Sequence, residues 1–270
     1  MNIENISIKK RTENTHKGSY GTVLIIAGSV GMTGAAMMCG KAALKSGVGM
    51  VKFFVPEELF HILQIGVPEA TCIVRDIDNI NLFDFDAIAL GPGLGISKAN
   101  ISLIKKVLNE YAGKLVLDAD GLNCVMKYKL YGNLRQTKAE VIITPHEGEA
   151  KRLLEIDNIE DRFLAAKELA SIFNTTAVMK GPGTIVVSGE DVYINNTGNP
   201  GMATGGAGDS LTGIIAALLA QGYDTYDAAM LGVYIHGYAG DICASEIGEI
   251  GMTAMDIVEA IPRVFKMLNK

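Results

Sequence analysis

Short runs of apolar residues alternate with longer amphipathic segments along most of the chain. The runs are rich in Val, Ile and Leu and generally stop at Gly, Pro or Asp, as buried strands do when helices cover both faces of a parallel sheet. The segments between them have the periodicity or the composition of helices. The predicted strands are residues 22–27, 50–55, 87–90, 115–117, 141–144 and 177–179, and the predicted helices are residues 35–46, 101–111, 148–154 and 162–173.

This alternation predicts an α/β fold in which a mostly parallel central sheet lies between two layers of helices. Residues 185–187 and 192–194 flank the turn sequence Ser-Gly-Glu-Asp, which predicts a late antiparallel hairpin. The chain after Asp209 reads as helical almost to Lys270. A length of 270 residues with 49% apolar residues is sufficient for one large core, and no linker divides the chain. We therefore expect a single domain over residues 1–270.

Polar or glycine-rich segments follow four of the predicted strands. They are residues 91–95, 118–123, 144–149 and 180–184. In parallel α/β sheets, ligands bind at the carboxyl ends of the strands, which all lie at one edge of the sheet. Each segment alone is weak evidence, but together they predict a binding site along this edge.

The strongest candidate for chemistry is the segment 204–209, which reads Thr-Gly-Gly-Ala-Gly-Asp and leads into an apolar helix. Glycines let a ligand approach the backbone, and a helix N-terminus offers unpaired N–H groups and a favourable dipole to an anion. A carboxylate at Asp209 would repel a bound phosphate, which suggests that it accepts or positions the proton of a hydroxyl that attacks the phosphate. Asp209 could also cap the helix, and the two roles are compatible. The predicted anion hole consists of Gly205, Gly206, Ala207 and Gly208.

His146 and Glu149 lie three residues apart on one face at the predicted start of a helix. Mg²⁺ favours one or two carboxylates together with phosphate oxygens, so Glu149 could ligate Mg²⁺ directly or through water. His146 could bind a ligand hydroxyl or phosphate. Helix capping by Thr144 with an acidic first turn is the alternative explanation of this segment.

Three further segments each have two interpretations. Lys180 begins a loop that could surround a nucleotide with its ammonium toward phosphate, or it is an ordinary surface lysine. Asp118 and Asp120 could contact a ligand, or could be turn and cap residues. Residues 17–21 could supply a cation and backbone donors to a phosphate, or could form only a turn into the first strand.

Charge and composition exclude several classes of function. The formal net charge of −6 argues against nucleic acid and anionic membrane surfaces as partners. Four widely spaced cysteines predict neither a disulfide framework nor a zinc site, as in a reducing cytoplasm. The polar N-terminus predicts no secretory signal, and no window approaches the roughly 20 apolar residues of a membrane span. No G-x-G-x-x-G follows a strand, and the P-loop spacing fails around Lys41.

Taken together, the motifs resemble the ribokinase-like superfamily and, within it, the NAD(P)H-hydrate dehydratase family. The glycine-rich loop is shared with kinases of hydroxymethylpyrimidine, hydroxyethylthiazole and pyridoxal, whereas the segments at 31–35 and 144–149 favour the dehydratase. The resemblance implies a ribokinase-like three-layer α/β/α fold. It extends from residue 16 to residue 263 and includes residues 27–29, 31–35, 91–95, 117–120, 144–146 and 199–209.

The resemblance also implies a function. The family repairs NADH and NADPH whose nicotinamide ring has been hydrated, in the S form, and converts ADP to AMP, or ATP to ADP, plus phosphate. Because hydroxide is a poor leaving group, phosphoryl transfer to the ring hydroxyl would precede elimination. The implied cofactor is Mg²⁺, and the implied assembly is a cytoplasmic homo-oligomer, a tetramer. The implied binding residues are Ala35, Gly95, His146 and the catalytic Asp209 for the hydrate, and Lys180, Gly181, Pro182, Gly183, Thr184 and Gly208 for the nucleotide.

The chain departs from the family pattern in two ways. Glu147 stands where the family usually has Pro, which adds a negative charge beside the proposed metal and substrate site. The epimerase domain that is often fused N-terminally is absent, so we expect a separate protein to carry out epimerisation.

Two other functions compete with the dehydratase. A small-molecule kinase of the same superfamily, of the hydroxymethylpyrimidine or hydroxyethylthiazole type, would release a stable phosphorylated product. A catalytically silent nucleotide-binding sensor would have no need of a carboxylate at Asp209.

Overall fold

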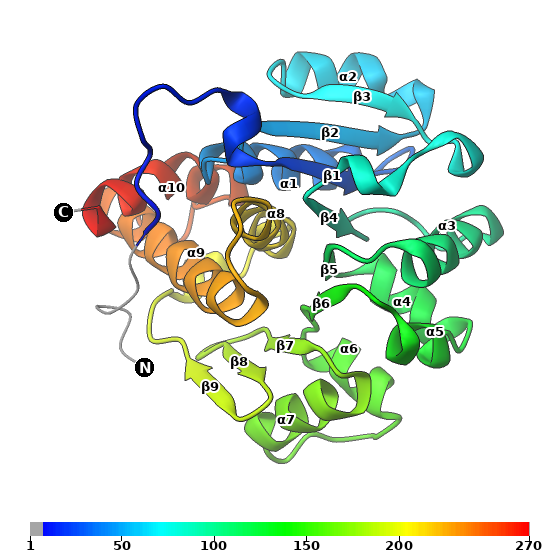
Figure 1. Cartoon of the computed structure of the whole chain (residues 1–270). Helices are drawn as coiled ribbons and strands as arrows, with labels where there is room; N and C mark the ends of the chain where they lie inside the picture. The colour runs from blue at the N-terminus through cyan, green and yellow to red at the C-terminus, as the bar shows by residue number, and fades with distance from the viewer. Residues whose placement is uncertain (1–7, 270) are drawn as a thin grey trace.

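The computed structural model describes residues 8–269, which build one nine-stranded sheet with helices on both faces (Figure 1). Lys270 and the first seven residues of the predicted polar N-terminus lie outside the described residues. The strands lie in the order β3-β2-β1-β4-β5-β6-β7-β8-β9. The strands are β1 (Thr22–Ile26), β2 (Met50–Val55), β3 (Thr71–Val74), β4 (Ala87–Leu90), β5 (Lys114–Leu117), β6 (Glu140–Ile143), β7 (Thr176–Met179), β8 (Ile185–Ser188) and β9 (Asp191–Ile194).

All neighbouring strands from β3 to β7 pair in parallel, and β8 and β9 form an antiparallel hairpin beside β7. The predicted three-layer fold, with a mostly parallel sheet and a late hairpin, is confirmed. The carboxyl ends of β1, β4, β5, β6 and β7 therefore meet at one edge of the sheet, where the predicted ligand segments begin.

The helices form the two outer layers. They are α1 (Thr33–Lys45), α2 (Phe60–Gly66), α3 (Lys98–Glu110), α4 (Asp120–Lys127), α5 (Tyr131–Gln136), α6 (Glu147–Leu154), α7 (Arg162–Phe173), α8 (Ala207–Ala220), α9 (Thr225–Ile247) and α10 (Ala254–Leu268). Figure 1 shows α1, α8, α9 and α10 grouped on one side of the sheet and α3 to α7 on the other. Alternate strand residues serve the two layers: Val23 and Ile25 pack with the first group, Leu24 and Ile26 with the second.

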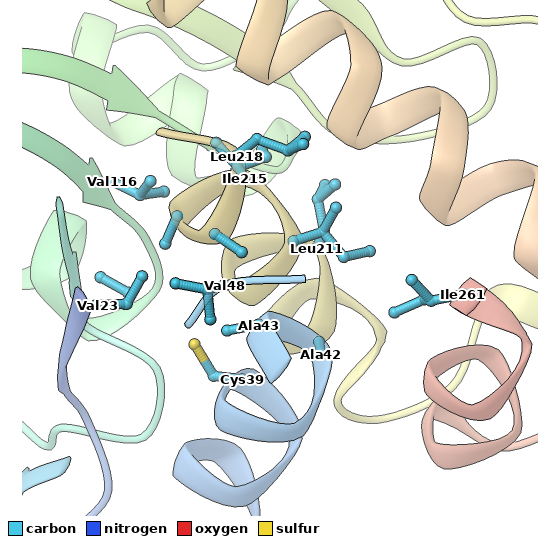
Figure 2. Packing of buried hydrophobic residues seen from close by; sticks show 14 of the residues in the cluster. Val23, Cys39, Ala42, Ala43, Val48, Val116, Leu211, Ile215, Leu218 and Ile261 are labelled. Atoms are coloured by element: carbon cyan, nitrogen blue, oxygen red, sulfur yellow. The ribbon is translucent and has the colours of Figure 1, made fainter. Parts of the chain in front are cut away.

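Helix α8 lies against the middle of the sheet because α1 permits a very close approach. A Cβ at Gly213 would lie 2.1 Å from the carbonyl oxygen of Cys39, so only glycine fits at this crossing. Figure 2 shows Ala42 and Ala43, two small side chains, on the part of α1 that lies next to α8. This contact fixes the position of α8, whose N-terminus carries the glycine-rich loop.

Four elements were not predicted from the sequence. Strand β3 is short and half exposed at the edge of the sheet, and α2 and α5 are only one or two turns long. Helix α4 begins inside segment 118–123, for which the sequence predicted a polar segment after a strand and no helix. The helical region after Asp209 is three helices, α8 to α10.

The four cysteines are free thiols. Within residues 8–269, no helix combines the length and the apolar character needed to span a bilayer.

Candidate active site

A cavity of about 650 Å³ opens at the carboxyl edge of the sheet. Its wall is formed by segment 180–184 after β7, residues 195–203 after β9, the first turns of α8 and the middle of α9. The structure thus brings together the residues that were expected to bind the nucleotide. They are Lys180, Gly181, Pro182, Gly183, Thr184 and Gly208.

One arginine shapes the first wall of the cavity. The guanidinium of Arg162, at the start of α7, donates to the carbonyl oxygens of Pro182 at 2.5 Å and Lys180 at 3.1 Å. It also donates to the carbonyl oxygen of Met179 at 3.3 Å. These bonds hold the loop in a fixed shape before any ligand arrives.

The second wall was missed from the sequence. Asn195 donates to the carbonyl oxygens of Thr197 at 3.1 Å and Val233 at 3.2 Å, which ties the segment to α9. The carboxylate of Asp241 accepts from the amide of Asn199 at 3.0 Å. A signal was present, because β9 runs antiparallel to β8 and therefore ends at the same edge as β7, followed by the polar sequence Asn-Asn-Thr-Gly-Asn.

The predicted anion hole lies at the N-terminus of α8. Gly206 has a φ of +91°, and a Cβ there would lie 2.2 Å from the sulfur of Met38, so the turn into α8 requires glycine. The backbone N–H groups of Gly205, Gly206 and Gly208 have no hydrogen-bond acceptor within residues 8–269. Unpaired donors at a helix N-terminus are suited to phosphate oxygens.

Lys180 is not an ordinary surface lysine. Its side chain is 17% exposed, and its Nζ lies 2.7 Å from Oδ1 of Asp118 and 3.8 Å from Oε2 of Glu149. Burial alone would lower the pKa of Lys180, but the two carboxylates outweigh burial and the pKa is raised. The ammonium therefore stays charged, 3.6 Å from the place that a Cβ of Gly208 would occupy.

Asp118 is not merely a turn residue either. It directly follows β5, is 1% exposed, and its second oxygen, Oδ2, accepts from the hydroxyl of Thr212 on α8 at 2.7 Å.

Asp209 lies in the first turn of α8, beside this charged group. Burial, followed by the negative charge of Asp118, raises the pKa of Asp209 from 3.8 to about 7; Lys180 opposes the shift and Asp120 adds to it. A carboxyl group with a pKa near neutrality can take up a proton at physiological pH, as a general base requires.

The residues expected to bind the hydrate lie outside the cavity, on neighbouring loops of the same edge. The backbone N–H of Gly95 donates to the carboxylate of Asp120 at 2.7 Å. A Cβ at Gly93 would lie 2.8 Å from the Cβ of Ala35, so this loop contacts the first turn of α1. Asp209 directly follows Gly208, which lines the cavity, and the charges of both Lys180 and Asp120 affect its pKa.

His146 and Glu149 form a reciprocal cap at the start of α6. The backbone N–H of His146 donates to Glu149 at 2.8 Å, and that of Glu149 donates to Nδ1 of His146 at 3.2 Å. The capping residue is therefore His146, whereas the expected cap, Thr144, has a buried hydroxyl with no partner among the described residues. The charge of Glu147 is paired with Lys151 at 3.0 Å.

Two further predicted groups of residues can be compared with the geometry. Among residues 8–269, no group of three or more His, Cys, Asp or Glu side chains is arranged to hold a metal ion, so a dedicated protein cage for Mg²⁺ is absent from this part of the chain. Residues 17–20 form a short 3₁₀ turn before β1, at the opposite edge of the sheet. They do not contribute to the cavity described here.

Comparison with known proteins identifies the family. A model of NAD(P)H-hydrate dehydratase matches residues 23–263, most of the chain. The chain belongs to the NAD(P)H-hydrate dehydratase family. Within this family it is 37% identical over 259 residues to the ADP-dependent (S)-NAD(P)H-hydrate dehydratase of Neisseria meningitidis, which covers 93% of this chain and 87% of the relative.

In longer members of the family, about half of the length is similar to this chain. A bifunctional NAD(P)H-hydrate repair enzyme of Moorella thermoacetica is 38% identical over 280 residues, which covers 97% of this chain and 52% of the relative. The chain thus spans about half the length of the bifunctional relatives that it matches.

Solved structures agree with the family. An ADP/ATP-dependent NAD(P)H-hydrate dehydratase of Bacillus subtilis, co-crystallised with ATP/Mg²⁺, superposes with a TM-score of 0.85 at 31% identity, covering 97% of this chain and 94% of that chain. A hydroxyethylthiazole kinase of Pyrococcus horikoshii shares the fold alone, with a TM-score of 0.65 at 17% identity over 92% of this chain and 89% of that chain.

Proposed function

We propose that this chain dehydrates the S form of hydrated NADH and NADPH, at the expense of ADP or ATP. Membership of the dehydratase family supports this function. The observation that carries it is the position of Asp209, a partly buried carboxyl group with a pKa raised to about 7, in the first turn of a helix whose N-terminus is of the phosphate-binding type. A protein that only bound nucleotide would not need a proton acceptor at that point.

The proposed chemistry has two steps. The ring hydroxyl of the hydrate attacks the terminal phosphorus of the nucleotide while Asp209 takes its proton, and the bond from phosphorus to the AMP or ADP leaving group breaks. The carbon–oxygen bond of the phosphorylated ring then breaks with its electron pair on phosphate. The neighbouring ring carbon loses a proton, and the double bond of NADH re-forms.

The two substrates are assigned to neighbouring parts of the site. We place the nucleotide in the cavity, with its terminal phosphates at the anion hole of Gly205, Gly206, Ala207 and Gly208 and beside Lys180. We place the hydrated nicotinamide against Ala35, Gly95 and His146, so that its hydroxyl reaches Asp209 from the side opposite the nucleotide.

Mg²⁺ fits this site as a companion of the nucleotide. Mg²⁺ commonly binds one or two carboxylates together with substrate phosphates, and it neutralises phosphate charge. Glu149 is buried close to Lys180, and its Oε2 already accepts the backbone N–H of His146. Its other oxygen, Oε1, lies 3.5 Å from Nε2 of His146 and is the one that could serve the ion directly or through water.

The proposal also includes a cellular location, an oligomeric state and a partner enzyme. Four free thiols suit a reducing cytoplasm, and we propose that localisation. We further propose a homo-oligomer, a tetramer, and an epimerase that supplies the S form of the hydrate. The existence of bifunctional NAD(P)H-hydrate repair enzymes among the relatives supports such a functional link.

The direct experiment is incubation of the S hydrate of NADH with the protein, Mg²⁺ and either ADP or ATP. We expect the absorbance of the reduced nicotinamide to return with at least one nucleotide, and not without a nucleotide. No recovery with either nucleotide, together with phosphorylation of a hydroxymethylpyrimidine or hydroxyethylthiazole alcohol, would support the kinase instead.

A further inference from the structure

Asp118 is the point at which three elements of the site meet. It follows β5, its Oδ1 accepts from Lys180 after β7, and its Oδ2 accepts from Thr212 on α8, both at 2.7 Å. The partners are 62 and 94 residues away in sequence. The sequence left Asp118 open between a ligand contact and a turn residue, and it did not point to Thr212.

The stability of the fold alone does not explain this buried ion pair. A buried ion pair generally contributes little net stability compared with apolar side chains of the same volume, because both charges lose their hydration. Here both carboxylate oxygens are paired, as a buried charge requires, and the cation held by Oδ1, Lys180, lines the cavity beside Gly208. The ion pair therefore serves mainly to fix the position of the ammonium of Lys180.

Glu149 is a second carboxylate that competes with Asp118 for the ammonium of Lys180. Glu149 lies 3.8 Å from the same ammonium, on the side of α6. Without the charge of Asp118, Lys180 would lose the partner that fixes its ammonium and would be left between the weaker attractions of Glu149 and Asp209. The hydroxyl of Thr212 fixes the carboxylate of Asp118 relative to α8, the helix that also carries Asp209.

We propose that Asp118 is a positioning residue, which holds the ammonium of Lys180 beside the anion hole and links it through Thr212 to the helix that carries Asp209. This inference rests on the proposed function, since it concerns the alignment of a transferred phosphoryl group. Asp118 itself touches neither substrate. Its effect is on the geometry of attack, where a displacement of about 1 Å can cost about 100-fold in rate.

The test is a double-mutant cycle of Asp118→Asn and Lys180→Met. An asparagine keeps the shape but places an NH₂ donor at one of the two oxygen positions, so it cannot accept from both Lys180 and Thr212 where they now stand. We expect Asp118→Asn to lower kcat about 100-fold without raising KM for ADP, because the change also removes a negative charge near the phosphates. In the Lys180→Met background, the same substitution should have much less effect on kcat.

Thr212 provides a matched pair of variants should Asp118→Asn fold poorly. Thr212→Val removes the hydroxyl at constant shape and should lower kcat about tenfold, whereas Thr212→Ser keeps the hydroxyl and should stay close to wild type. Calorimetric titration with ADP in the absence of hydrate gives a readout besides turnover, and we expect Asp118→Asn to bind ADP at least as tightly as wild type.

Three results would overturn the inference. They are an unchanged kcat in Asp118→Asn, a loss that multiplies fully with that of Lys180→Met, or equal behaviour of Thr212→Val and Thr212→Ser. A wild-type protein that does not dehydrate the hydrate at all would instead refute the proposed function.

Discussion

Replacement of Asp209 by Asn is expected to stabilise the protein at neutral pH while it removes activity. The pKa of Asp209 is raised by burial from 3.8 to about 7, so the folded protein binds its proton more tightly than the unfolded chain does. Below pH 3.8 the group is protonated in both states and has no effect. As the pH rises from about 4 to about 7, the unfolded chain loses the proton first, and the folded state becomes progressively less stable.

The magnitude follows from the same values. A difference between 3.8 and about 7, at about 1.4 kcal/mol per pKa unit, sets a limit of about 4 kcal/mol on the penalty above pH 7. The asparagine is itself polar and partly buried, so we expect a gain of about 2 kcal/mol from Asp209→Asn at pH 8. For a chain of this length that corresponds to a rise of about 4 °C or more in Tm.

The assay is urea denaturation of wild type and Asp209→Asn at pH 4.5 and pH 8, with turnover measured on the same preparations. The two proteins should differ little in the free energy of unfolding at pH 4.5, and the variant should be the more stable at pH 8. Turnover should fall by a factor of about 10² to 10⁴, the usual cost of a lost general base, with ADP affinity within a few-fold of wild type. A variant that is less stable at pH 8, or that turns over normally, would refute the reasoning about Asp209.

Three further predictions address the rest of the site. Arg162→Met should raise KM for ADP about tenfold with kcat nearly unchanged, because segment 180–184 loses two hydrogen bonds and the adjoining Met179 loses one. Lys167→Ala on the same helix should leave both constants unchanged, and steady-state kinetics with varied ADP would reveal the opposite pattern. Gly206→Ala should clearly lower Tm, because Gly206 has a positive φ and an added Cβ would collide with Met38. Gly205→Ala should not lower Tm, because a Cβ at Gly205 would meet open space; similar Tm values for the two variants would contradict the account of the loop. Glu149→Gln should raise the Mg²⁺ concentration needed for half-maximal activity, and an unchanged titration would leave Glu149 as a helix cap only.

Much of the fold was predictable because it depends on local patterns. The buried parallel strands are uniform apolar runs that end at glycine, proline or aspartate, and the hairpin has a recognisable turn. The elements that were missed lack such patterns. Strand β3 lies at the sheet edge with only partial burial, and α4 starts at residues that are equally common in loops.

The site likewise contains residues that local patterns predicted and residues that they did not. The glycine-rich loop and segment 180–184 are contiguous in sequence, so their residue types predicted a phosphate and nucleotide site, and the structure brings the two together in one cavity. The pairing of Asp118 with Lys180 and Thr212 joins residues from three distant segments, and no local signal distinguishes such an aspartate from a turn residue. Arg162 was hidden for the same reason, since its partners are the backbone of another loop.

The stoichiometry of phosphate release is the most direct test of the proposed repair reaction. Phosphorus NMR would follow a reaction of hydrated NADH with ADP to completion, with nicotinamide absorbance recorded on the same sample. If the ring hydroxyl is phosphorylated only to be expelled, each ADP consumed yields one AMP, one inorganic phosphate and one restored NADH, and no phosphorylated organic product persists. Accumulation of a stable phosphomonoester, or phosphate release without restored NADH, would contradict the account.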